Sequence, residues 1–254
     1  MSYREILPHP ALRAYVDRFW VQAPDVAAPL EPQRILPDGC IDLLVSLRRR
    51  TCDVVGTMTR ALVVSQPAAA TAAVRFRPGG AVAFLGVAAH ELTDRNVSAR
   101  DVGLHWLSPR VLEAEQPALA VQELERSLLL RLGALERPHR IAAAAVSACF
   151  GEAPPRVQEL AHGLGYSRQR LTRLLLDQVG IGAKELLRVG RLQRAVDQLQ
   201  RTEGASLAQA ATGLGYFDQA HMCRDFRELV GLSPALVRSS ARTIFPIRSL
   251  LAGA

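Results

Sequence analysis

The segment RQRLTRLLLDQV, residues 168–179, places side chains that can form paired hydrogen bonds on one face of an expected helix. Gln169, Thr172 and Arg173 stand three and four positions apart, with Arg170 beside them, so one helical turn brings them together. Glutamine and arginine match the donor and acceptor pattern on the edges of adenine and guanine in the major groove of DNA. This face therefore has the chemistry to read a base sequence.

A second segment, residues 219–230 (QAHMCRDFRELV), presents a similar outward face. The side chains on that face are Gln219, Ala220, Cys223 and Arg224, with His221 next to them. Both segments follow the tripeptide Leu-Gly-Tyr, which occurs at 164–166 and again at 214–216. A repeat of this kind indicates that one structural unit is used twice.

Each segment is preceded by a short amphipathic run and a glycine, the order expected of a helix-turn-helix unit. The apolar faces of the two runs are Val157, Leu160, Ala161 and Leu164, and Leu207, Ala210, Ala211 and Leu214. Gly165 and Gly215 each follow four residues after an alanine of that face and allow a tight turn between the helices.

Polar residues at the expected helix starts support the same organisation. Ser167 and Asp218 suit N-caps, and Ser206 with Gln209 predicts a capping box. The residues expected to point inward are Leu171, Leu174, Leu175 and Val179 in the first copy, and Met222, Phe226 and Val230 in the second. Between the copies, residues 184–200 predict one long helix, with Leu192, Val196 and Leu199 buried. Such a rigid connector could hold the two outward faces about one turn of DNA, roughly 34 Å, apart.

The excess of positive charge lies in the half of the chain that holds the repeat. The 254 residues carry a formal net charge of +7. Residues 1–138 have 16 basic and 15 acidic side chains, whereas residues 139–254 have 15 basic and 9 acidic ones. A localised positive field favours a polyanionic partner for the C-terminal half.

Residues 139–240 resemble the DNA-binding part of the AraC/XylS family of bacterial transcription regulators. GYFDQAHMCRDFRELVGLSP, residues 215–234, is similar to the signature G-[FY]-x-[DS]-Q-[AS]-[HY]-x-x-R-x-F-x-x-x-x-G-x-S-P of that family. LLRVGRLQRAVDQL, residues 186–199, is similar to its connector. The resemblance implies an all-α domain of seven helices with two helix-turn-helix motifs that bind double-stranded DNA.

The resemblance and the chemistry of the side chains together suggest roles for individual residues. Base reading is expected from Gln169, Arg170, Thr172, Arg173, Gln219, Ala220, His221 and Arg224. Phosphate contacts are expected from Ser167, Arg168, Lys184, Arg188 and Arg227. The chain departs from the family pattern with GIGA at 180–183 in place of G-x-S-P, and with Leu176 and Cys223 at commonly polar positions. These departures bear on the target sequence rather than on the class of protein.

The first 110 residues predict a mixture of helices and strands. Residues 10–20 put Leu12, Tyr15, Val16 and Phe19 on one helical face, and residues 81–92 predict a second helix. Strands are expected within 34–47, after a turn at 37–39, and at 54–55, 62–64 and 74–77. The predicted fold class is α+β: a mixed N-terminal domain, by analogy a small β-barrel with helices, followed by an all-α C-terminal domain.

This N-terminal part resembles a sensor or dimerisation domain fused to such regulators. The stretches that carry this weaker resemblance are YREILPHPALRAYV, ILPDGCIDLLV and VRFRPGGAVAFLGVAAHELTD. The candidate residues for binding an effector are Arg34, Asp38, Arg75 and Arg77. We favour the interpretation that these four are exposed strand and turn positions. The alternative function is a DNA-binding protein without an effector, whose N-terminal domain only dimerises.

Between these parts, an apolar stripe predicts an amphipathic helix over about 110–137. The stripe consists of Val121, Leu124, Leu128, Leu132 and Leu135. It can pack on its own domain or on a second chain, and its spacing suits both. Pro138 marks the boundary. The expected organisation is an N-terminal domain at 1–110, a connector at 111–137, the DNA-binding domain at 139–240 and a tail at 241–254.

An enzyme is not expected from the side chains that could do catalysis. The six histidines are scattered, and no His-x-His pair, nucleophile elbow, P-loop or dinucleotide motif occurs. Cys40, Cys52, Cys149 and Cys223 lack metal-ligand spacing and indicate reduced cytosolic thiols. We therefore predict no catalytic residues, no cofactor and no metal.

The sequence shows neither a signal peptide nor a membrane span. The first residues, MSYREILPHP, lack an apolar h-region, and the longest apolar stretch, residues 141–150, is too short to cross a bilayer. We expect a cytoplasmic regulator of transcription, activator or repressor, with DNA as its partner. RNA polymerase, a small-molecule effector and a second copy of the chain are the further candidate partners.

Overall fold

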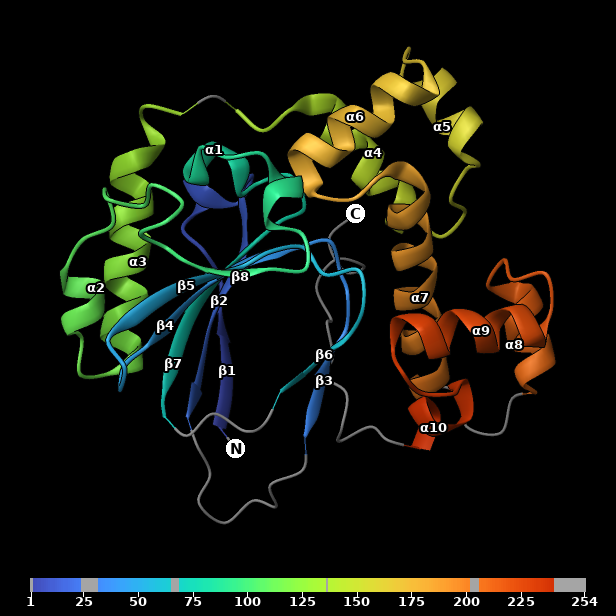
Figure 1. Ribbon diagram of the computed structural model, residues 1–254, viewed down its shortest axis with the longest axis horizontal. Coiled ribbons are helices and arrows are strands. Elements are labelled where there is room, and N and C mark those ends of the chain that lie inside the picture. The colour runs from blue at the N-terminus through green and yellow to red at the C-terminus, as the bar shows by residue number, and fades with distance from the viewer. Residues whose placement is uncertain (1, 24–31, 65–68, 136, 202–205, 240–254) are drawn as a thin grey trace.

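The computed structural model describes residues 2–23, 32–64, 69–135, 137–201 and 206–239. A sheet-rich N-terminal region and a helical C-terminal region lie side by side (Figure 1). The α+β class predicted from the sequence is therefore confirmed. The predicted tail at 241–254 lies outside the described residues.

Six antiparallel strands form the main sheet, in the order β1-β2-β7-β4-β5-β8. These strands are β1 (Ser2–Ile6), β2 (Val16–Ala23), β4 (Ile41–Ser46), β5 (Thr51–Val55), β7 (Thr71–Phe76) and β8 (Asn96–Ser98). A separate ribbon pairs β3 (Gln33–Ile35) with β6 (Leu62–Val64). Among the described strands, β1 and β8 are the edges, so the main sheet is open where the analogy had suggested a barrel.

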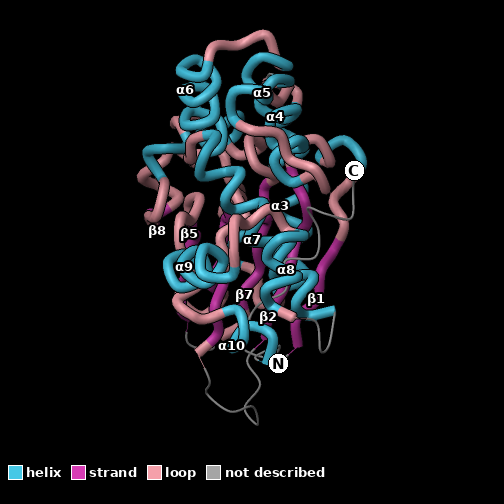
Figure 2. The backbone as a smooth tube through the Cα atoms, turned by 90° about the vertical axis from the view of Figure 1, so that its right-hand side faces the viewer, coloured by secondary structure: helices cyan, strands magenta, loops and turns pink. Residues whose placement is uncertain are grey.

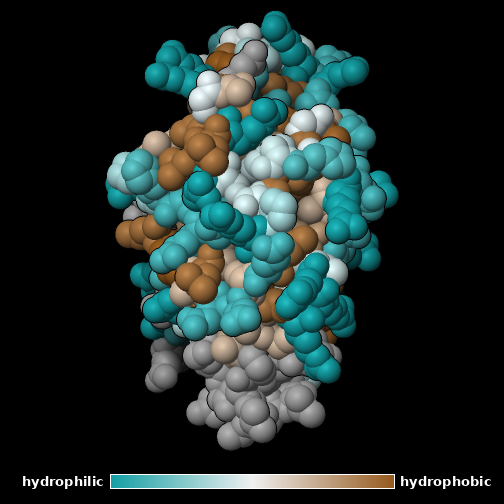
Figure 3. All heavy atoms as spheres, turned by 90° about the vertical axis from the view of Figure 1, so that its left-hand side faces the viewer, coloured by the Kyte–Doolittle hydropathy of each residue, from teal (hydrophilic) through white to brown (hydrophobic). Residues whose placement is uncertain are grey.

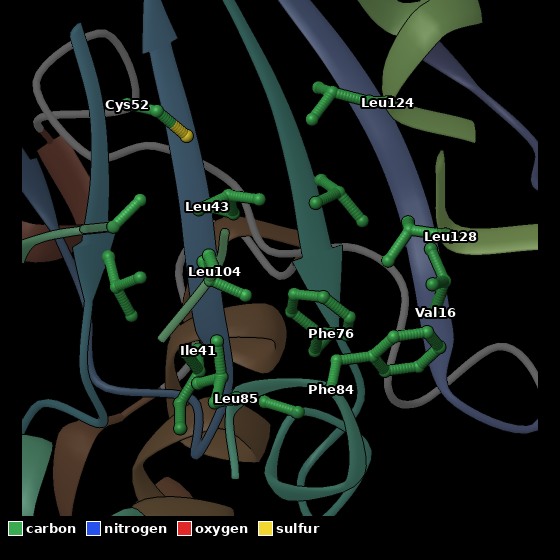
Figure 4. Packing of buried hydrophobic residues seen from close by; sticks show 14 of the residues in the cluster. Val16, Ile41, Leu43, Cys52, Phe76, Phe84, Leu85, Leu104, Leu124 and Leu128 are labelled. Atoms are coloured by element: carbon green, nitrogen blue, oxygen red, sulfur yellow. The ribbon is translucent and has the colours of Figure 1, made fainter. Parts of the chain in front are cut away.

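The long helix α3 (Pro117–Leu132) covers one face of the main sheet and completes the N-terminal core. Leu124 and Leu128 of this helix share that core with Val16, Phe76 and Phe84 (Figure 4). Burying each such side chain stabilises the fold by about 1.5–3 kcal/mol. The spacing of the apolar stripe at 121–135 suited packing on its own domain or on a second chain. In the structure it packs on its own domain.

The helix predicted over 110–137 is interrupted near its start. A short helix, α2 (Arg110–Glu113), ends at Ala114, whose backbone is extended, and Pro117 begins α3. Proline is favoured at the first helical position because its missing N–H has no partner there in any case.

On the outer surface of this part of the molecule, apolar side chains form separate groups among polar ones (Figure 3).

The helix predicted over residues 10–20 is wrong. A single 3-10 turn, η1 (Pro10–Leu12), is followed by strand β2. The strand has a register shift between Val16 and Arg18, and such a bulge adds one residue to the usual alternation. Val16 and Phe19 therefore both face the core at a spacing of three, which imitates a helical face.

The helix predicted over 81–92 is also divided. Its first part is α1 (Val82–Leu85), and its last part is the 3-10 helix η2 (Ala89–Leu92). Gly86 ends α1 in the left-handed conformation at φ 69°, which glycine adopts without a steric penalty. The strands predicted between residues 34 and 77 are confirmed, as is the turn before β4, where Gly39 has φ 77°.

In the described residues from 140 onward, all the regular elements are helices. They are α4 (Arg140–Phe150), α5 (Val157–Gly163), α6 (Arg168–Val179), α7 (Ala183–Arg201), α8 (Leu207–Gly213), α9 (Gln219–Leu229) and α10 (Pro234–Ser239). The long helix predicted over residues 184–200 is α7, and it contributes to two cores. Leu186 and Val189 pack with α4, α5 and α6, whereas Leu192 and Val196 pack with α8, α9 and α10.

Candidate nucleic-acid interface

Helix α6 begins and ends as its sequence predicts. The Ser167 side chain accepts a hydrogen bond from the backbone N–H of Arg170 at 3.2 Å and so caps the helix. The buried side of α6 consists of Leu171, Leu175 and Val179, while Leu174 is half-buried. The residues on its outer side are Gln169, Arg170 and Arg173, which are exposed, and Thr172, which is half-buried.

Helix α9 repeats this arrangement in the second copy. The Asp218 carboxylate caps the helix by accepting from the backbone N–H of His221 at 2.6 Å. Met222 and Phe226 are fully buried. The outer residues are Gln219, Ala220 and Arg224, which are exposed, and His221 and Cys223, which are half-buried. The capping box predicted for Ser206 is wrong, because its side chain makes no capping hydrogen bond.

The turns that join the helices of each copy are also alike. Gly165 and Gly215 adopt φ 69° and φ 77°, and each is followed by a tyrosine whose N–H donates back to an alanine carbonyl. These glycines are 50 residues apart, but Leu171 and Met222, which occupy matching buried positions, are 51 apart. The difference is Phe217, an additional residue before the N-cap of α9, whose side chain is 89% exposed.

In the view of Figure 2, α6 lies above α9, and α5 and α8 lie beside them. We call α6 and α9 the recognition helices. The side chains predicted to read bases thus gather on two exposed faces that α7 holds apart, an arrangement suited to two segments of one duplex.

Comparison with known proteins agrees with this geometry. Residues 160–240, which include both turns and both recognition helices, match a helix-turn-helix domain family. The C-terminal region is an AraC-type helix-turn-helix domain. Residues 160–240 are accordingly a DNA-binding domain of this type. Residues 4–98 match a second family, described as a domain of unknown function (DUF6597).

Similarity to solved structures is weaker. ToxT from Vibrio cholerae O395 is 10% identical, with a TM-score of 0.41, and the match covers 100% of this chain and 99% of that one. The unsaturated fatty acid bound ToxT of V. cholerae strain SCE256 is 11% identical, with a TM-score of 0.39, and the match covers 82% and 90%. Likeness at this level carries neither fold nor function over to this chain. No curated protein matches the sequence.

The basic residues predicted to contact phosphates differ in their availability. Arg168, Lys184 and Arg227 are exposed on the AraC-type domain. Arg188 is not available, because its Nε lies 2.8 Å from Oδ1 of Asp225 and its Nη1 lies 3.0 Å from Oε1 of Glu228. The hydrogen bond with Glu228 and that with Asp225 raise the pKa of Arg188. We therefore remove Arg188 from the predicted phosphate contacts, since it joins α7 to α9.

Arginines also stack on the tyrosines of the two turns. The guanidinium of Arg170 lies 4.4 Å from the ring centre of Tyr166, and that of Arg191 lies 4.8 Å from the ring of Tyr216. Tyr216 is only 3% exposed, and burial raises its pKa. Such cation–π contacts hold a side chain in one direction. Arg170 is thus directed along the turn that precedes α6.

Two of the candidate effector residues form a buried ion cluster in the N-terminal region. Arg75 lies 3.2 Å from Asp38 and 3.0 Å from Asp42, its direct partner across β7 and β4. Burial raises the pKa of Asp38, whereas Arg75 acts to lower it. Asp38 is 1% exposed. The favoured interpretation that these were exposed positions is wrong for Asp38 and Arg75, because strand pairing closes them in.

The other two candidate effector residues lie apart from this cluster. Arg34 is half-buried on the β3–β6 ribbon. Arg77 is 40% exposed, donates to the backbone carbonyl of Arg13, and lines a groove of about 1480 Å³ between the two regions. Across the groove lie Lys184 and Arg191 of α7. The four candidates therefore do not form one site.

The remaining reactive side chains are the cysteines and the potential metal ligands of the described residues. No three His, Cys, Asp or Glu residues in the described ranges come together as metal ligands. Cys40, Cys52 and Cys149 are buried, and burial raises their pKa, to about 12 for Cys52 and Cys149. Within the same ranges, none of the helices has the length and apolar character needed to cross a membrane.

Proposed function

We propose that this protein regulates transcription by inserting α6 and α9 into successive major-groove segments of one DNA duplex. The observation that carries this proposal is the pair of capped recognition helices, each of which exposes Gln and Arg side chains. The concentration of positive charge in residues 139–254 supplies the attraction to phosphates.

The proposed DNA contacts divide into residues that read bases and residues that hold phosphates. Gln169 and Arg173 of α6 occupy the positions that Ala220 and Arg224 hold in α9, because matching positions are 51 apart. Arginine pairs with guanine and glutamine with adenine, while an alanine methyl suits the methyl group of thymine. The full set proposed for base reading remains Gln169, Arg170, Thr172, Arg173, Gln219, Ala220, His221 and Arg224. Ser167, Arg168, Lys184 and Arg227 are proposed to hold phosphates.

Replacing Arg224 by alanine should weaken binding to the specific site by about 1–3 kcal/mol and relax base preference at one position. The test is a fluorescence-anisotropy titration on the duplex selected by the full chain from a random library, and on scrambled DNA. Arg227→Ala is the matched control, because it removes the same charge from the same helix and should weaken both duplexes alike. Equal weakening of both duplexes by Arg224→Ala would make Arg224 a phosphate contact.

Replacing Lys184 by alanine should weaken binding to every duplex by a similar factor. A lost phosphate contact lowers the slope of log affinity against log salt concentration by about 1. A salt series measured on specific and scrambled DNA tests this expectation. Arg126→Ala, on the exposed side of α3, serves as the control and should leave the slope unchanged. An unchanged slope for Lys184→Ala would contradict the phosphate role.

We also propose that the N-terminal region regulates this binding. An effector in the groove beside Arg77, or a second copy of the chain, would alter how readily both recognition helices engage at once. Once one recognition helix has bound the duplex, binding of the other is intramolecular. Its contribution to affinity therefore depends on its effective concentration, and so on how the two helices are held. A titration on one half-site and on two half-sites, with and without residues 1–138, measures this contribution. If removing those residues leaves the ratio of the two affinities unchanged, the regulatory role is wrong.

A further inference from the structure

One loop of the N-terminal region touches the carboxyl ends of both recognition helices. The loop is residues 56–61, between β5 and β6, and we call it the bridging loop. The Thr57 hydroxyl donates to the carbonyl of Val179, the last residue of α6, at 2.5 Å. The backbone N–H of Ala61 donates to the carbonyl of Leu229, the last residue of α9, at 2.7 Å.

The contact with α6 is reinforced by a second hydroxyl. Thr93, just after η2, donates to the carbonyl of Gly180 at 2.7 Å. Gly180 has φ 93°, and a Cβ at this position would lie 2.9 Å from Oγ1 of Thr93 and 3.1 Å from Cβ of Thr57. The matching residue of the second copy, Gly231, has φ 75° and open space around it. Gly180 is therefore constrained by the N-terminal region as well as by its own backbone.

The bridging loop is itself held firmly by its own domain. The carboxylate of Asp94 accepts from the N–H of Thr59 at 2.7 Å and from its hydroxyl at 2.6 Å. The N–H of Asp94 in turn donates to the carbonyl of Thr57 at 2.9 Å. At Gly56 a Cβ would stand 1.8 Å from the carbonyl oxygen of Leu92, so the backbones are in direct contact. The loop is thus fixed to the N-terminal region, so that it sets the position of the helix ends and is not displaced by them.

These contacts matter because the last carbonyls of a helix have no partner within the helix. A donor from outside satisfies such a carbonyl and also fixes where the end of the helix lies. The two recognition helices belong to separate cores, which α7 joins. A single firm loop bonded to both helix ends adds a second connection between them, parallel to α7.

We infer that the bridging loop is the positioning element that sets the separation of α6 and α9. Thr57, Thr93 and Gly180 are the positioning residues on the α6 side. The inference deepens the proposed function and rests on it for its consequence: the N-terminal region determines which spacing between two half-sites the protein accepts. A change in the N-terminal region that moves this loop would change binding without touching a recognition side chain.

The separation of the helices can be measured without DNA. One spin label is placed on the native Cys223 of α9 and another on Arg173→Cys of α6, while the other three cysteines are buried. The full chain should give a narrow distance distribution. Replacing both threonines, as Thr57→Val and Thr93→Val, removes both hydroxyl donors but keeps the shape of each side chain, and should broaden the distribution about twofold. Thr51→Val, on β5, removes a hydroxyl that donates to Asp53 of the same strand, and should leave the distribution unchanged.

The consequence on DNA is measured on unlabelled protein. Inserting one base pair between the half-sites selected by the full chain moves one of them by about 3.4 Å and rotates it. The unmodified protein should lose about tenfold in affinity on that insertion, and the double threonine variant less than about threefold, with affinity for a single half-site unchanged. Gly180→Ala should likewise relax the spacing requirement, whereas Gly231→Ala, with the same backbone strain but no contact, should not.

The two measurements separate failure of the inference from failure of the proposed function. If the unmodified chain binds selected DNA but the double variant keeps both the narrow distribution and the tenfold spacing penalty, the inference is overturned. If the unmodified chain binds no sequence selectively, the proposed function is overturned. In that case the distance distribution alone decides whether the loop positions the helices.

Discussion

Replacing Arg75 by methionine lowers the free energy of unfolding by about 3–5 kcal/mol near neutral pH, because it leaves two buried carboxylates without their counter-charge. Asp38 and Asp42 are 1% and 9% exposed, and the Arg75 side chain is 11% exposed. Urea denaturation of the full chain measures the loss. The matched control is Arg77→Met, since the side chain of Arg77 is 40% exposed and should contribute about 1 kcal/mol or less.

The loss at Arg75 should also depend on pH in a defined direction. Burial raises the pKa of Asp38 in the folded protein, and removing Arg75 raises it further. A carboxyl group with a raised folded pKa binds more protons when folded, so stability falls as pH rises through the window between its unfolded and folded pKa. The deficit of Arg75→Met should therefore be smaller at pH 5 than at pH 8. The double variant Arg75→Met with Asp38→Asn should recover part of the loss at pH 8. A deficit that is equal at both pH values and unaffected by Asp38→Asn would contradict the ion-cluster account.

Replacing Phe226 by alanine should cost about 3–5 kcal/mol, because its side chain is fully buried against α7 and α8 and its loss leaves a cavity. Phe217 offers a matched control within the same motif. It is 89% exposed, so Phe217→Ala should change the free energy of unfolding by about 0.5 kcal/mol or less. Thermal and urea denaturation of both variants measure the difference.

The Phe226 variant should also lose DNA binding selectively. The core around Phe226 holds α9, whereas α6 belongs to the other core. Affinity for a duplex with two half-sites should therefore fall to that for the half-site read by α6. If Phe226→Ala weakens binding to both half-sites equally, the two cores are not independent, and the division of the AraC-type domain at α7 is wrong.

The recognition helices could be predicted from the sequence because the signals that define them are local. Ser167 and Asp218 cap helices within three residues, and Gly165 and Gly215 supply the left-handed turns. Inward and outward faces follow from a period that a helix imposes on its own residues. The family matched by residues 160–240 and the geometry agree with this prediction.

The N-terminal region was less predictable because its pattern depends on strand pairing. The bulge between Val16 and Arg18 gave a strand the spacing of a helical face. Arg75 meets Asp38 and Asp42 only because β7 pairs with β4, and no local spacing indicates that contact. Arg188 likewise could be counted as a phosphate contact until α9 was seen to place Asp225 beside it.

The sequence by itself determined that two copies of a DNA-reading unit stand on either side of one long helix. Only the tertiary structure decided what holds those units in place. Thr57 and Val179 are 122 residues apart, and the bond between them depends on two domains docking face to face. Local periodicity specifies helices, because a helix bonds to itself within four residues. The relative position of two helices depends on contacts between distant parts of the chain, which no short stretch of sequence contains.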